Sequence, residues 1–79
     1  MKLHLGCGDK ILEGFTNVDI RKKEGVDLVD DISSISGIKN GSVELIYACH
    51  VLEHFGRYEY KKVLKRWYDV LETGGTLRL

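Results

Sequence analysis

The sequence predicts an α/β fold with a Rossmann-like, doubly wound and mostly parallel sheet. Short apolar segments typical of strands recur along the chain, and connections of about ten or more residues separate most of them. Parallel neighbours require connections of that length, because the chain must return across the sheet. An amphipathic helical segment precedes the last strand candidate, and strands that alternate with helices or long crossovers are typical of a parallel sheet.

Four strand candidates precede that helix, and the residue types of each support the assignment. The first alternates polar and apolar residues and runs into the glycine turn Gly6-Cys7-Gly8. The second carries an acidic residue at its end, and the third is a short apolar run. The fourth is the strongest, because β-branched and aromatic residues follow the Asn40-Gly41 turn. The four candidates span residues 2–5, 16–20, 26–29 and 43–48.

The clearest helical segment spans residues 57–71, and residues 49–55 suit a short helix. We expect Thr73-Gly74-Gly75 to end the long helix, because glycine takes the left-handed conformation that a helix C-terminus favours. Residues 76–79 then begin a fifth strand. We therefore expect an incomplete sheet of about five strands, with the last one truncated, in a fragment of a longer chain. The apolar stripe of the long helix consists of Tyr60, Val63, Leu64, Trp67 and Leu71.

The composition is that of a small globular domain, and we treat residues 1–79 as one partial domain. Of the 79 residues 43% are hydrophobic and 30% charged, with a formal net charge of zero, which excludes collagen-like and highly charged disordered classes. A neutral chain gives no electrostatic reason to expect nucleic acid or an acidic membrane as partner. No apolar run approaches the ~20 residues of a membrane span, and no signal peptide is evident. Cys7 and Cys49 lack metal-finger spacing, which favours reduced thiols in a cytoplasmic protein.

Glycine and acidic residues follow the first three strand candidates, where open α/β sheets bind their ligands. Gly6 and Gly8 let the backbone bend sharply and let a ligand approach with no Cβ in the way. Asp19 can accept hydrogen bonds from the hydroxyls of a ribose. The pair Asp30-Asp31 places an acid after the third strand that can accept one from an adenine amino group, while Ile32 packs on the ring. Each feature alone also fits a plain turn or a solvated carboxylate, but their combination favours a nucleoside cofactor.

With these residues in place, the chain resembles class I S-adenosylmethionine-dependent methyltransferases of the small-molecule type. The resemblance extends from residue 2 to residue 79. It implies S-adenosylmethionine as the cofactor and methyl transfer to an unknown acceptor, with activity only as part of a longer chain or an assembly. The segments that carry it are Leu5-Gly6-Cys7-Gly8, Val18-Asp19-Ile20, Val51-Leu52-Glu53-His54 and Gly74-Gly75-Thr76-Leu77.

The resemblance also implies roles for individual residues. In such enzymes the glycine loop passes under the methionine part of the cofactor, and an acid at the end of the second strand holds the ribose; Asp19 matches that acid. His50 or His54 could act as a base if either faces the acceptor. The cofactor-binding set that follows is Gly6, Cys7, Gly8, Asp19, Ile20, Asp31, Ile32 and Cys49.

The chain departs from the family pattern at several positions. His4 replaces the acid that usually precedes the glycine loop, and Lys10 stands where a third glycine is common. Asp19 follows Gly6 by thirteen residues, which is shorter than the ~20 residues typical of dinucleotide folds. The spacing therefore predicts that the usual first helix is missing or reduced to a turn.

Two other enzyme classes have partial motifs in this sequence. His50-Val51-Leu52-Glu53-His54 fits the inverted zinc-protease signature, with both histidines on one helix face and Glu53 as a base. A catalytic zinc normally takes three protein ligands, and because no convincing third ligand follows, we expect no metal site. A dinucleotide-dependent dehydrogenase would need glycine at Ile11, so its fingerprint fails.

A non-catalytic alternative also remains open. The domain could keep the Rossmann-like half of the fold and act as a binding or interaction module. The fifth strand would be an exposed edge without further neighbours, and an exposed edge invites pairing with another chain. We therefore expect self-association through that edge.

Overall fold

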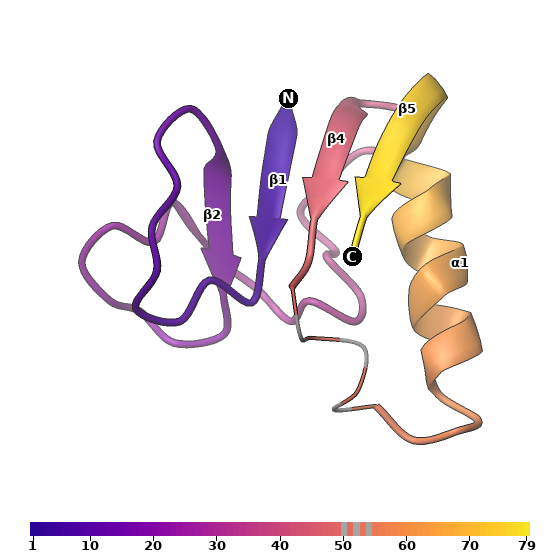
Figure 1. The fold of residues 1–79 in the computed structure, drawn as a ribbon, viewed down its shortest axis with the longest axis horizontal. Helices are drawn as coiled ribbons and strands as arrows, with labels where there is room; N and C mark the ends of the chain where they lie inside the picture. The colour runs from indigo at the N-terminus through magenta and orange to yellow at the C-terminus, as the bar shows by residue number, and fades with distance from the viewer. Residues whose placement is uncertain (50, 52, 54) are drawn as a thin grey trace.

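The computed structural model describes residues 1–49, 51, 53 and 55–79. These residues form a five-stranded, all-parallel sheet in the order β3-β2-β1-β4-β5, and one α-helix. The predicted parallel α/β architecture is confirmed (Figure 1). The elements are β1 (Lys2–Leu5), β2 (Thr16–Asp19), β3 (Leu28–Val29), β4 (Val43–Tyr47), α1 (Tyr60–Val70) and β5 (Leu71–Arg78).

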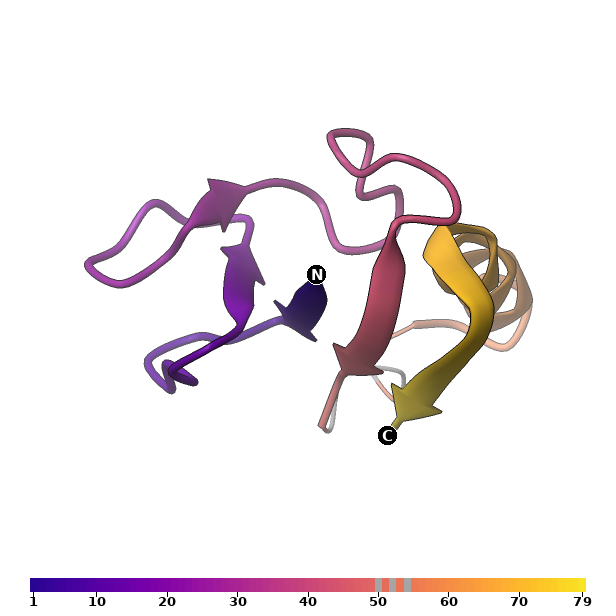
Figure 2. The same cartoon turned by 90° about the horizontal axis from the view of Figure 1, so that it is seen from above.

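The helix α1 lies on one side of the sheet, next to β5 (Figures 1 and 2). Its buried residues are Val63, Trp67 and Val70, three or four positions apart as one helix face requires. Trp67 is fully buried, and burial of a large apolar side chain contributes roughly 1.5–3 kcal/mol to folding. Helix and sheet share a core with Leu3, Leu5, Val18, Ile35, Ile38, Val43, Ile46, Ala48 and Val51.

The end of α1 differs from the expectation. The helix ends at Val70, and Leu71 is already extended, with φ −68° and ψ 138°. Thr73-Gly74-Gly75 therefore lies within β5 and does not end the helix. Val43 of β4 pairs with Leu71 of β5, and Leu45 pairs with Thr76. Two residues along β4 therefore correspond to five along β5, which forms a bulge. The two glycines make this bulge possible, because Gly74 has φ +83° and a Cβ on Gly75 would lie 2.9 Å from the Glu72 carbonyl oxygen.

Turns replace a helix between β1 and β2, as the short spacing predicted. Asn17 holds this connection: it is 2% exposed, accepts the backbone N–H of Leu12 at Oδ1 (3.0 Å), and donates from Nδ2 to the carbonyls of Leu12 and Phe15. Because an amide oxygen carries no proton and can only accept, the bond between Oδ1 and His4 Nδ1 (2.9 Å) requires the histidine to carry its proton on Nδ1. His4 is thus a buried structural residue of the sheet, 4% exposed.

None of the helical segments in the described part of the chain combines the length and apolar character that a bilayer crossing needs.

Candidate functional site

The residues expected to bind a ligand gather at one edge of the sheet. All five strands are parallel, so their carboxyl ends meet at this edge; Figure 1 shows the arrows of β1, β2, β4 and β5 pointing toward it. The chain order reverses at β1, which has β2 on one side and β4 on the other. Such a switch point is where open α/β sheets bind ligands. The glycine loop follows β1, Asp19 ends β2, and Cys49 follows β4.

The glycine loop leaves β1 in a left-handed turn. Gly6 and Gly8 have φ of +65° and +54°, values that glycine adopts without the strain of a side chain. The backbone N–H groups of Gly6 and Cys7 both donate to the Val18 carbonyl, at 3.0 and 3.2 Å. Beside Gly8 a Cβ would meet nothing within 4 Å, whereas at Gly6 it would lie 3.0 Å from Val51 Cγ2. The loop is therefore open at Gly8 and closely packed at Gly6.

Cys7 lies between these glycines with its side chain buried. Its sulfur is directed toward β2, with Gly8 O at 3.6 Å and Asp19 Oδ2 at 4.0 Å. Burial, and then the nearby carboxylate of Asp19, raise the pKa of the Cys7 thiol. A thiol held neutral in this way is a poor nucleophile, so Cys7 contributes packing and backbone to the loop.

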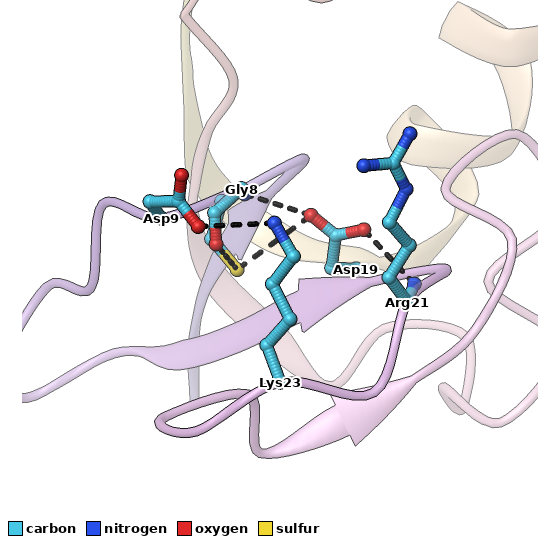
Figure 3. A network of polar contacts seen from close by, with 6 residues as sticks. Gly8, Asp9, Asp19, Arg21 and Lys23 are labelled. Carbon is cyan, nitrogen blue, oxygen red and sulfur yellow. Dashed lines mark hydrogen bonds and ion pairs between the residues drawn. The ribbon is translucent and has the colours of Figure 1, made fainter.

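Asp19 is the central acceptor of the site (Figure 3). Its Oδ2 accepts the Gly8 backbone N–H at 2.7 Å, and its Oδ1 accepts that of Arg21 at 3.0 Å. Burial raises the pKa of this carboxyl, but backbone N–H groups of residues 21, 8 and 20 and the charge of Lys23 outweigh it and leave the pKa lowered. Asp19 is therefore an ionised, half-buried carboxylate with remaining lone pairs for the hydroxyls of a ligand.

An ion pair closes one side of this arrangement. Lys23, from the connection between β2 and β3, places Nζ 3.0 Å from Oδ1 of Asp9 in the glycine loop. Figure 3 shows the lysine side chain extending across the site beside Asp19. Sequence reasoning did not identify Lys23, because it belongs to a run of charged loop residues with nothing to distinguish it.

The two acids after β3 have different roles. Asp30 holds the following turn, because its carboxylate accepts the backbone N–H of Asp31 at 2.8 Å and that of Gly37 at 3.0 Å. Asp31 is exposed, and Ser33 donates to its Oδ1 from both backbone and hydroxyl, which lowers the pKa of Asp31. Its Oδ2 takes no hydrogen bond from the described residues and is free for a ligand.

The structure brings Ile32 to the glycine loop and leaves Ile20 apart from it. The Ile32 Cδ1 atom lies 3.6 Å from the place that a Cβ on Gly6 would occupy. Ile32 is half-buried and packs on the core. Ile20 is 66% exposed, so its side chain is presented to solvent beside Asp19.

The rim after β4 is described only in part. Cys49 is exposed. The pKa of the Tyr47 hydroxyl is raised, first by a hydrogen bond with the Cys49 side chain and second by the negative charge of the Cys49 thiolate. The two candidate bases, His50 and His54, lie outside the described residues. Over residues 1–49, 51, 53 and 55–79, no three side chains of metal-binding type come together.

Lys10, at the position of a third family glycine, is exposed, and its backbone N–H donates to the Cys7 carbonyl at 2.9 Å. The glycine loop thus closes as a turn that needs no glycine there.

A family model described as a methyltransferase domain matches residues 3–79. Searches of curated proteins and of solved structures give no significant match.

Proposed function

The chain belongs to the methyltransferase domain family, and on that premise we propose that it binds S-adenosylmethionine where β1, β2 and β4 end. The observation that carries the proposal is the joint placement of Gly8 and Asp19, 2.7 Å apart through a backbone N–H. This contact sets an ionised carboxylate beside a loop with free space at Gly8. Both features suit a ligand that combines a ribose with an extended chain.

Each part of the proposed site would hold one part of the cofactor. Asp19 would accept hydrogen bonds from the two ribose hydroxyls. The Gly6–Gly8 loop would lie under the methionine part, and Ile20, Asp31 and Ile32 would form the adenine side. Cys49 would close the rim after β4. The bound cofactor supplies an electrophilic methyl group, and what this chain supplies is orientation of the two reactants, which can remove a large part of a reaction barrier.

The acceptor and its activation are further parts of the proposal. We propose that His50 or His54 takes a proton from the acceptor, since both follow β4 in the sequence and histidine titrates near neutral pH. The acceptor class stays open, because no described residue identifies it. Free thiols at Cys7 and Cys49 support a reducing, cytoplasmic location.

Calorimetric titration with S-adenosylhomocysteine tests the binding proposal. Asp19→Asn removes the charge and should weaken binding roughly ten- to hundredfold, since a hydrogen bond to a charged group contributes about 1.5–3 kcal/mol. Asp69→Asn is the matched control, because Asp69 is a carboxylate of α1 paired with Lys65. Equal affinity for Asp19→Asn and wild type, with both folded by circular dichroism, would overturn the proposed site.

A methyl-transfer assay, run beside the titration, separates an enzyme from a binding module. A chain that binds S-adenosylhomocysteine but transfers no methyl group to any of a panel of small acceptors, alone or in a longer chain, would favour the non-catalytic alternative. Turnover that is lost in His50→Ala or His54→Ala, with affinity for S-adenosylhomocysteine unchanged, would support the proposed base.

A further inference from the structure

One side chain of α1, Arg66, binds the connection between β3 and β4. Its Nε donates to the Ser34 carbonyl at 2.6 Å. Its Nη2 donates to the carbonyls of Ile35 (3.0 Å) and Ile38 (2.8 Å), and its Nη1 to the side-chain oxygen of Asn40. A guanidinium is a rigid planar fork, so these four acceptors are fixed relative to the helix and to one another.

The next residue of the helix provides a second anchor. Trp67 donates from Nε1 to the Ile32 carbonyl at 2.8 Å, and its ring is fully buried. The side chains of two consecutive helix residues therefore hold the connection at Ile32 and again over residues 34–40.

This connection needs support from outside, because it contains a strained residue. Ile35 has φ +37°, a region that β-branched residues rarely adopt. Strained backbone persists where the surroundings hold it, and such residues concentrate at binding sites. Here the surroundings are the core, in which Ile35 is fully buried, and Arg66, which binds its carbonyl.

The held turn begins at the proposed adenine side of the site. The backbone N–H groups of Ser34 and Ile35 both donate to the Asp31 carbonyl, at 3.2 and 2.7 Å. The position of Asp31 therefore depends on the residues that Arg66 binds. Ile32 lies between them and approaches the glycine loop at Gly6.

We propose that Arg66 is a positioning residue that fixes Asp31 and Ile32 for recognition of an adenine base. This inference rests on the proposed function. Arg66 acts through the turn, from the face of the sheet that carries α1 (Figure 2). Loss of the Arg66 guanidinium should therefore weaken binding of the adenine base more than it weakens the hydrogen bonds of Asp19 to the ribose.

The test compares two ligands that differ only in the base, S-adenosylhomocysteine and S-inosylhomocysteine, by calorimetric titration. In Arg66→Met the affinity for the adenine ligand should fall about tenfold, while that for the inosine ligand changes less than about threefold. Arg66→Lys should restore part of the preference, because an ammonium group can still donate to some of the carbonyls. Lys65→Met is the matched control, since Lys65 is an exposed neighbour paired only with Asp69 among the described residues.

Each other outcome has a defined meaning. An equal loss of affinity for both ligands would assign Arg66 a general structural role and overturn the proposal. Unchanged affinity for both ligands would also overturn it. If the wild-type chain binds neither ligand, the proposed function itself fails and this inference fails with it. Should Arg66→Met not fold, Asn40→Ala removes one acceptor outside the core. An affinity that falls about twofold for the adenine ligand, and not for the inosine ligand, would then support the proposal. Unchanged affinity for both ligands would overturn it.

Discussion

The backbone N–H of Gly8 donates a 2.7 Å hydrogen bond to Oδ2 of Asp19, and this contact joins the loop after β1 to the end of β2. A carboxylate that accepts backbone N–H groups is both a binding group and a structural one. Its protonation therefore affects ligand affinity and the free energy of unfolding together.

Acid should destabilise the fold through Asp19. The pKa of this carboxyl is lower in the folded chain than its ordinary value of 3.8, so its contribution is fully present above that value and is lost as pH falls through the lowered pKa. Thermal unfolding measured from pH 6 to pH 2 should show that the melting temperature decreases once the pH is below about 4. Asp19→Asn should flatten part of this drop, whereas Asp69→Asn should not; identical profiles would contradict the assignment.

Asn17→Ala should strongly destabilise the chain. The buried amide of Asn17 joins His4 to Leu12, Phe15 and Asp27, and its removal takes a partner from the buried His4 ring and from half-buried backbone groups of Leu12 and Phe15. A loss of about 2–4 kcal/mol is expected, because each unsatisfied buried group costs about 1–3 kcal/mol. Urea unfolding monitored by Trp67 fluorescence measures it. A change below about 0.5 kcal/mol, the level of ordinary surface substitutions, would show that the turns between β1 and β2 do not depend on this network.

Gly75→Ala should also destabilise the fold. The new Cβ would lie 2.9 Å from the Glu72 carbonyl oxygen and 3.1 Å from that of Val43, and both are backbone atoms that cannot move independently. A cost of about 1–3 kcal/mol is expected from overpacking. Gly56→Ala is the control, because its Cβ would meet only Glu59 Oε1, at 3.9 Å. Equal unfolding midpoints in urea for the two variants would mean that the β5 bulge adapts.

We expect the chain to self-associate through the edge of β5. Residues 76–78 pair with β4 on one side, and no other described strand lies on the other side. Thr76→Lys places a charge on this edge, a device that protects natural edge strands. Sedimentation at increasing concentration should show association in wild type and less in Thr76→Lys. Glu24→Gln changes net charge equally on an exposed loop, so equal reduction in both variants would point to net charge instead of the edge.

Prediction from sequence worked best where the signal is local. Asp19 and the Gly6–Gly8 turn were placed at one edge because an acid and a glycine turn each follow an apolar strand, and the structure brings Gly8 and Asp19 into contact. The start of α1 at Tyr60, three residues later than predicted, also has a local reason. Residues 57–59 precede the apolar stripe, and Glu59 makes no side-chain capping bond.

The residues that sequence reasoning missed act through distant partners. In the sequence Arg66 is one of several basic residues on its helix, and the partners that distinguish it lie 26 to 32 residues earlier in the chain. Asn17 carries no pattern of its own, since its role depends on the missing helix between β1 and β2. The sequence predicts a helix end at Gly75, because two glycines follow a helical pattern. The bulge that they form instead depends on how β5 pairs with β4, which the local sequence does not show.

The long separation between Arg66 and the carbonyls that it binds has a consequence for folding kinetics. The turn after β3 contains the strained Ile35, and its partners belong to a helix that follows β4. Contacts this far apart in sequence form only after a large loop closes. In a φ-value analysis, Arg66→Lys should therefore accelerate unfolding and leave refolding nearly unchanged. The adenine side of the proposed site would be the last part to form and the first to be lost.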